Sequence, residues 1–261
     1  MIKKIIFSLL FIAITTFSFA QTEDIQAKAD SIAAATKMTT DSTSNNQVKK
    51  TEIYKGTYRG IFMGLGFVVG KSDSAGDAIN YGKSTDFMIG YTFKTDLCSF
   101  DAIGYDVTYR ITSFNLKQNS AKILPNNVQH KSEVMNFNDF ELTLFNRFQI
   151  GNNAHSLGHY LDIGAYGDWT FSVVHKTVDT YSVANAAGAS TTDTKDKGLV
   201  FVNPFNYGLM ARIGFNRWMI YGDYRLSNQF KSGYVFPELP KITLGVQLHL
   251  FGKRKRKESK K

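Results

Sequence analysis

Aliphatic residues occupy every second position in the closing stretch of the chain. From Ile242 to Leu250 the even-numbered residues are all Ile, Leu or Val, and the residues between them are small or polar. We place Thr243, His249 and Phe251 together on this second face. Because successive side chains of a β-strand point to opposite faces, the alternation predicts a strand that lies between two different environments.

The same alternation recurs along the chain, in aromatic-rich segments that are separated by polar connections. Strands of about ten residues, each with one apolar face, are typical of a closed sheet that crosses a membrane. We therefore predict an all-β protein, an eight-stranded antiparallel up-and-down transmembrane β-barrel. The expected strands are Tyr58–Gly70, Ser84–Thr95, Phe100–Leu116, Phe137–Ile150, Tyr160–Thr177, Leu199–Phe215, Trp218–Asn228 and Lys241–Phe251.

The connections between these strands alternate between long and short, and the stretch between Thr177 and Leu199 is expected to be one of the long loops. In outer-membrane barrels the long loops are extracellular, and an even strand number places both termini in the periplasm. A soluble barrel of the lipocalin type would instead turn its apolar faces inward around a ligand. The long aromatic face of each strand, with Tyr and Trp near the strand ends, favours the membrane.

The first residues predict export. Lys3 and Lys4 precede an almost wholly apolar run that ends at Ala20, which indicates a cleaved secretory signal peptide over residues 1–20. A polar leader over residues 21–56, disordered or weakly helical and periplasmic, then precedes the barrel, which we assign to residues 57–252. Residues 253–261 form a basic tail, also expected in the periplasm. The location predicted for the mature chain is the cell outer membrane.

The net charge of +9 does not indicate a nucleic-acid partner. Lys3 and Lys4 contribute two of these charges, and residues 253–261 contribute a net six, so the rest of the chain is almost neutral. Nucleic-acid binding needs basic residues spread over a folded face. The tail is instead a candidate contact for an anionic lipid or polymer surface, although a solvated tail is the plainer interpretation. Its candidate residues are Lys253, Arg254, Lys255, Arg256 and Lys257.

Charged residues recur on the face that we expect to line the lumen. Eight strands enclose only enough space for side chains, and buried charges are costly unless they are paired. We therefore predict a network of ion pairs that plugs the lumen; a narrow ion path or a proton relay is the functional alternative. The expected members are Asp86, Asp106, Arg110, Asp139, Glu141, Arg147, Asp162, Asp168, Arg212, Asp223 and Arg225.

Candidate catalytic groups are few. Asp139 and Glu141 share a face at a separation that an acid–base pair could use, but arginines across the lumen are expected to neutralise them. A lipid-active hydrolase would need a Ser, a His and a carboxylate facing lipid. We place Val173 and His175 on the outward face of the fifth strand, where His175 has no converging partners. We expect no catalytic residues, no metal ligands and no cofactor, and the lone Cys98 can form no intrachain disulfide.

Three stretches near the C-terminus, NPFNYGLMARIGFN, YGDYRLSNQFK and PELPKITLGVQLHLF, carry a family resemblance. With their Gly, aromatic and aliphatic pattern, the chain resembles the PorT-like outer-membrane β-barrel proteins of Gram-negative bacteria, of the Bacteroidota type. The resemblance covers about residues 57–252 and implies an outer-membrane barrel. The named member of the family is implicated in protein secretion by the type IX system. The basic tail departs from barrels that end in an aromatic residue.

The predicted function is a non-enzymatic structural or interaction role in the outer membrane. The alternatives are a component of a secretion machinery, as the resemblance implies, and a lipid-active enzyme. Expected partners are outer-membrane lipid and a periplasmic or secretion-system protein, with no nucleic acid. The oligomeric state, the specific partner and any pore activity are left open by the sequence.

Overall fold

The structure is a computed structural model that describes residues 56–98, 100–150, 158–181 and 188–256. The predicted signal peptide, nearly all of the leader and residues 257–261 of the tail lie outside the described residues. No helix within the described ranges is long and apolar enough to cross a membrane. The elements are β1 Gly56–Val69, η1 Ala75–Asp77, η2 Tyr81–Lys83, β2 Thr85–Asp96, β3 Asp101–Asn115, β4 Ser132–Ile150, β5 His159–Thr180, β6 Thr191–Lys197, β7 Phe205–Phe215, β8 Trp218–Arg225 and β9 Ile242–Arg256.

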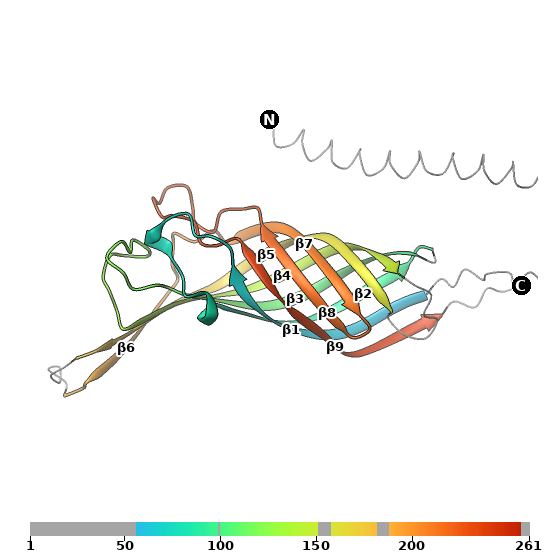
Figure 1. Cartoon of the computed structure of the whole chain (residues 1–261), viewed down its shortest axis with the longest axis horizontal. Helices are drawn as coiled ribbons and strands as arrows, with labels where there is room; N and C mark the ends of the chain where they lie inside the picture. Colours follow the sequence, from blue (N-terminus) through green and yellow to red (C-terminus); the bar gives the residue numbers. More distant parts are fainter. Residues whose placement is uncertain (1–55, 99, 151–157, 182–187, 257–261) are drawn as a thin grey trace, which may run out of the picture. The chain divides into compact units, whose positions relative to one another are not determined.

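Eight of the nine strands close into a ring. The sheet order is β4-β3-β2-β1-β9-β8-β7-β5, and a further pairing between β4 and β5 completes the circle (Figure 1). Every pairing is antiparallel, and the seam between the first and last strands runs from Gly56 opposite Arg256 to Val69 opposite Ile242. The predicted fold class, an eight-stranded up-and-down barrel, is confirmed.

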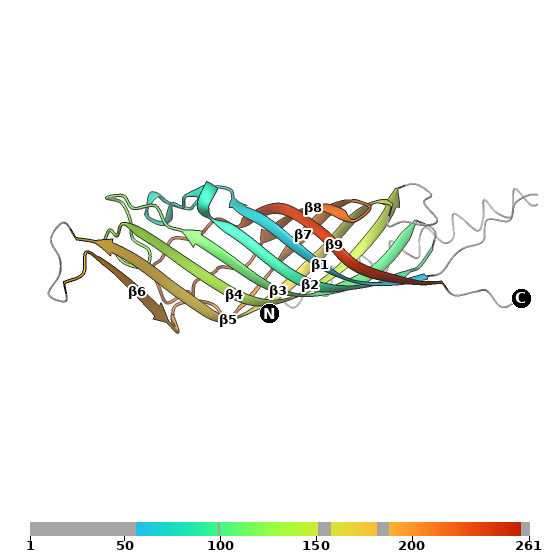
Figure 2. The ribbon, with the colours of Figure 1, turned by 90° about the horizontal axis from the view of Figure 1, so that it is seen from below.

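The outer surface of the ring is apolar. Outward positions on neighbouring strands carry large aliphatic and aromatic side chains, whereas the inward positions between them are buried. Figure 2 shows the strands side by side around the barrel, with β1 next to β9. A continuous apolar band around a closed sheet is the surface that a hydrocarbon environment requires, so the fold is a transmembrane β-barrel. Members of the band from all eight strands include Ile61, Leu65, Ile89, Tyr91, Ile103, Val107, Leu142, Leu144, Ile163, Leu209, Ile213, Ile220, Leu244 and Val246.

The connections alternate in length as predicted, and they define two ends of the barrel. We call the end with residues 97–98 and 216–217 the turn end, and the end with residues 70–84, 116–131, 198–204 and 226–241 the loop end. One expectation was wrong: the connection after β5 is not all loop, because Thr191–Lys197 forms the strand β6. It pairs with Val174–Thr180 of β5, and this hairpin projects beyond the loop end (Figure 1).

A β-bulge in β5 overturns the predicted facing of its second half. Asn138 pairs with Ser172 but Asp139 pairs with Thr170, so Phe171 is an extra residue on β5. One extra residue reverses the faces beyond it. Val173 and His175, which we expected to face outward, are therefore turned inward and are only 7% and 4% exposed.

A second irregularity lies on the closing seam. Ile61 pairs with Phe251 while Phe62 pairs with His249, so Leu250 is an extra residue in β9. Phe251, predicted to face inward, consequently points outward and is 74% exposed. The strand also continues to Arg256 in register with β1, so the first part of the predicted tail, residues 253–256, belongs to the barrel wall.

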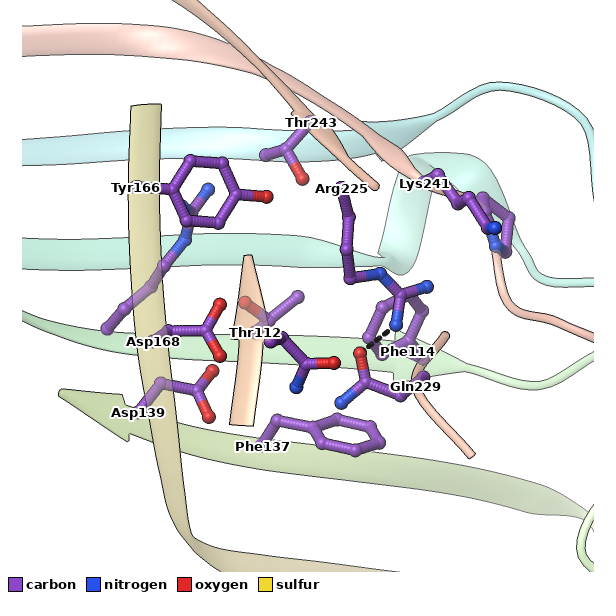
Figure 3. Close-up of a pocket in the computed structure, with 13 residues that line it drawn as sticks. Thr112, Phe114, Phe137, Asp139, Tyr166, Asp168, Arg225, Gln229, Lys241 and Thr243 are labelled. Atoms are coloured by element: carbon purple, nitrogen blue, oxygen red, sulfur yellow. Dashed lines mark hydrogen bonds between the residues drawn. The ribbon is translucent and has the colours of Figure 1, made fainter. Parts of the chain in front are cut away.

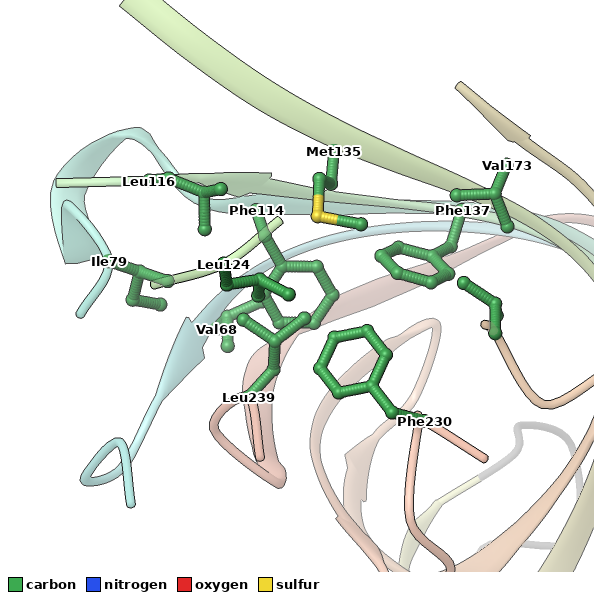
Figure 4. Packing of buried hydrophobic residues seen from close by; sticks show 11 residues of the cluster. Val68, Ile79, Phe114, Leu116, Leu124, Met135, Phe137, Val173, Phe230 and Leu239 are labelled. Atoms are coloured by element: carbon green, nitrogen blue, oxygen red, sulfur yellow. The ribbon is translucent and has the colours of Figure 1, made fainter. Parts of the chain in front are cut away.

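The loop end of the barrel is capped by packed side chains. Phe114, Phe137 and Val173 from the barrel wall contact apolar residues of the long loops, among them Leu124 and Phe230 (Figure 4). The loops also exchange backbone hydrogen bonds, such as Ile123 N–H to Gly76 O at 2.9 Å and Asp73 N–H to Glu238 O at 3.5 Å. The loops at this end are therefore a folded cap, with an apolar core of their own. The full cluster comprises Val68, Ile79, Phe114, Leu116, Leu124, Met135, Phe137, Val173, Val202, Phe230 and Leu239.

We predict that Gly214→Ala destabilises the barrel. An added Cβ would lie 2.0 Å from Cζ of Tyr160, whose ring cannot retreat because the Arg147 guanidinium stacks on it at 3.6 Å. Overpacking of this kind costs about 1–3 kcal/mol. The free energy of unfolding in detergent micelles, followed by tryptophan fluorescence in urea, measures the effect. Gly167→Ala is the matched control because its nearest neighbour would be 3.9 Å away; equal loss in both variants would contradict the account.

Candidate functional site

The interior of the barrel holds the charged residues that the alternating pattern pointed to. Ten of the eleven expected residues are buried, and Asp168 is partly exposed. They lie on six strands and are arranged in tiers along the lumen. The eleven are Asp86 on β2, Asp106 and Arg110 on β3, Asp139, Glu141 and Arg147 on β4, Asp162 and Asp168 on β5, Arg212 on β7, and Asp223 and Arg225 on β8.

Arg110 is the centre of the middle tier. Its Nε lies 2.7 Å from Oδ1 of Asp86, its Nη1 lies 2.7 Å from Oε2 of Glu141, and its Nη2 lies 2.7 Å from Oδ2 of Asp223. Asp223 belongs to β8, which is not a sheet neighbour of β3. One guanidinium therefore ties four strands together across the lumen. Tyr221 adds a second bridge, since its hydroxyl donates to Asp86 at 2.7 Å.

The tier toward the turn end contains two further guanidiniums. Arg147 donates to both carboxylate oxygens of Asp162, at 2.6 and 2.7 Å, in the two-pronged geometry that favours Arg over Lys. Arg212 donates to Asp106 at 2.5 Å, again between strands that are not neighbours in the sheet. Paired in this way, buried charges avoid the penalty of isolated ions.

The tier toward the loop end is less completely paired. A cavity of about 50 Å³ is lined there by Asp139, Asp168 and Arg225, among others (Figure 3). Oδ1 of Asp139 and Oδ1 of Asp168 accept no hydrogen bond from the part of the chain that the structure describes. Arg225 instead turns to the loop, where it pairs with Glu238 at 2.8 Å and donates to Gln229.

The expected set contains seven carboxylates and four guanidiniums. Arg110 is shared among three carboxylates, whereas Arg147 and Arg212 are each bonded to one. The excess of acidic groups therefore gathers at Asp139 and Asp168.

Several interior partners were missed by sequence reasoning. Glu133 is fully buried and binds Nε2 of His175 at 2.7 Å, Nζ of Lys122 at 2.9 Å and Nε2 of Gln118 at 2.8 Å. Glu133 shares the inward parity of Asp139, so an earlier start to the fourth strand would have found it. His175 could not be found that way because the bulge reverses its facing. Lys122, Gln118 and Glu238 come from loops, which carry no period-2 signal.

The site offers little for catalysis. Glu141 is occupied by Arg110 and Thr143, which leaves it no free proton-transfer role beside Asp139. His175 lies in the interior against Glu133, not against lipid. Among the described residues, no group of three or more His, Cys, Asp and Glu is arranged to hold a metal ion. What the arrangement does chemically is to fill the lumen with fixed charges, most of which are paired across or along the barrel wall.

Fold and site together define a class: a closed transmembrane β-barrel with a charge-filled interior. No family model matches the chain, and no curated protein matches it. Among solved structures, the chain is similar to Ail, the attachment invasion locus protein of Yersinia pestis, in a structure with the heparin analogue sucrose octasulfate. The two are 9% identical with a TM-score of 0.30, and the alignment covers 78% of this chain and 97% of Ail.

We predict opposite outcomes for two matched substitutions in the lumen. Asp86→Asn removes the negative charge from a carboxylate that accepts from Arg110, Thr112 and Tyr221. It should lower the free energy of unfolding by about 3 kcal/mol. Asp139→Asn removes a carboxylate whose Oδ1 has no donor, so stability should change by less than about 1 kcal/mol or rise. Urea unfolding of both variants in the same micelle compares them; equal losses would refute the uneven pairing.

Proposed function

We propose that this chain is an outer-membrane β-barrel protein with a non-enzymatic structural or interaction role, and that its capped loop end and its termini carry that role. The observation that carries the proposal is the set of ion pairs across the lumen, centred on Arg110 and Arg212. Because these side chains bridge opposite walls of the lumen, they favour a role as a rigid scaffold over a role as a pore. The polar turns and the apolar band support an outer-membrane location with both termini in the periplasm.

The hairpin of β5 and β6 is the element that we propose for contact with a partner. It projects past the loop end, and β6 is the last strand in the sheet order, with one edge unpaired within the described sheet. Its sequence alternates Thr, Asp and Lys, and the charged residues Asp193, Lys195 and Lys197 are exposed. Charges on an edge strand discourage unspecific pairing with strands of other chains. They still permit binding of a partner whose polar groups match them.

A second candidate is a component of a protein-secretion machinery of the type IX kind. The observation that favours it is the resemblance of the closing strands, from Asn203 to Phe251, to PorT-like proteins. The two roles differ in the partner: a secretion component would bind machinery in the periplasm. The lipid-active enzyme is not proposed, because the histidine on which it depended, His175, is turned into the interior.

Membrane insertion can be tested by placing an arginine at two different depths along the barrel. Leu142 lies in the apolar band and is 51% exposed, so Leu142→Arg should weaken folding into vesicles by about 2–4 kcal/mol. Val174→Arg is the control, because Val174 pairs with the polar residues Asn136 and Lys197 toward the loop end; its cost should stay below about 1 kcal/mol. Folding is read from the heat-dependent shift on gel electrophoresis. Equal tolerance of both arginines would contradict a membrane at the band.

If the ion pairs fill the lumen, the barrel should conduct few ions. In planar bilayers the intact protein should show no large, steady openings, because the tiers of Arg110 and Arg212 close the path. The double variant Arg110→Ala and Arg212→Ala, if it folds, should raise the conductance. Single-channel recording measures both. Large, steady openings of the unaltered protein would overturn the scaffold role.

The hairpin predicts the side on which partners bind. Replacing residues 178–193 by a short Gly-Ser turn joins Thr177 to its cross-strand partner Thr194 and removes most of the hairpin. The barrel should stay folded, because the ring closes without β6. Cross-linking in native outer membranes followed by mass spectrometry should then lose the extracellular partners by at least about tenfold. Partners that persist and are periplasmic would favour the secretion component.

A further inference from the structure

The outer surface near the turn end changes from apolar to cationic over two residues of β1. Ile61 lies between Tyr91 of β2 and Phe251 of β9 as their direct partner, and all three are exposed. The next outward row, one step nearer the turn end, consists of Phe93, Arg59 and Lys253. An apolar row is thus followed directly by a cationic one, as at the boundary between hydrocarbon and headgroups.

The apolar row forms a groove. Tyr91 and Phe251 are the large side chains on either side, and the smaller Ile61 lies between them. The groove measures about 290 Å³, and Arg59 and Lys253 line its end toward the turns. The bulge at Leu250 creates this shape, because without the extra residue Phe251 would face the lumen.

The two cations have an unusual relation. Arg59 and Lys253 are direct cross-strand partners, and both are exposed. Like charges opposite each other are destabilising on a sheet. Among the described residues, neither cation is paired with a carboxylate, and Arg59 is held over the ring of Phe93 at 5.3 Å. Two adjacent cations with no carboxylate partner in this part of the chain are placed to share one anion between them.

We infer that this groove binds one anionic glycerophospholipid of the leaflet that surrounds the turn end. The phosphate bridges Arg59 and Lys253, and an acyl chain lies over Ile61 between Tyr91 and Phe251. The apolar groove beside the cations selects a lipid over a free anion. The inference rests on the proposed membrane location. It also gives the start of the basic segment a defined position, because β9 carries residues 253–256 alongside Gly56–Arg59.

Native mass spectrometry of the full chain in detergent micelles, titrated with phosphatidylglycerol or with phosphatidylcholine of the same acyl chains, tests the site. One phosphatidylglycerol should be retained preferentially. Arg59→Gln and Lys253→Gln should each weaken its retention about fivefold, and together about 25-fold, as expected when basic residues near an anionic lipid surface are removed. Equal retention of phosphatidylcholine by the unaltered protein would overturn the inference.

Two further variants separate a built groove from general charge. Arg217→Gln removes the same charge from the exposed turn between β7 and β8, outside the groove, and should leave retention unchanged. Ile61→Trp fills the groove while keeping both cations in the chain, and it should abolish preferential retention. If Arg217→Gln matched Arg59→Gln, or if Ile61→Trp had no effect, the binding would be a property of net charge alone.

The controls also keep this inference separate from the membrane proposal. Folding of each variant into phosphatidylcholine vesicles, read from the gel shift, should match the unaltered protein, because the groove is not needed to close the barrel. Loss of folding in Leu142→Arg tests the membrane location of the apolar band and says nothing about lipid binding in the groove. Inorganic phosphate at the same concentration as the lipid should not displace it; displacement would overturn the assignment to a lipid.

Discussion

The closure of β1 onto β9 is the constraint on which the rest of the structure depends. In hydrocarbon there is no water to satisfy backbone N–H and C=O groups, so a sheet that crosses a membrane must have no free edge within it. Eight strands meet this requirement around an interior that is just wide enough for side chains to fill. Inward side chains can then meet across the lumen as well as along the wall, and a charge placed there is costly unless it is paired.

The interior follows from that geometry. Arg110 and Arg212 reach carboxylates on strands that are not their neighbours, so the tiers hold the circular cross-section together in a way that backbone hydrogen bonds cannot. Buried ion pairs contribute less to stability than their number suggests, because desolvation offsets most of the attraction. Their clearer effect is geometric, because they connect opposite walls of the barrel across the lumen. Where the acidic groups outnumber the arginines, at Asp139 and Asp168, the network is at its weakest.

Two single-residue bulges shape the two ends of the barrel, because each one changes the face on which the side chains beyond it lie. The bulge at Phe171 turns Val173 and His175 inward, where they build the apolar cap and the node around Glu133. The bulge at Leu250 turns Phe251 outward, where it forms one wall of the groove beside Arg59. The loop end thereby becomes a folded surface, and the turn end gains the groove that we propose for a lipid.

The sequence by itself determined the strands of the ring, their number, the inward position of all eleven charged residues and, up to the two bulges, the apolar face of each strand, because a period of two is a local property of the chain. The tertiary structure decided which ion-pair partner each charged side chain meets. Which carboxylate Arg110 meets depends on the curvature and register of the closed ring, and Glu238 reaches Arg225 only when a loop folds back. The facing predicted for His175 and Phe251 was wrong for one physical reason. A bulge shifts the phase of the alternation by one residue, and whether a strand accepts it is decided by the strand beside it.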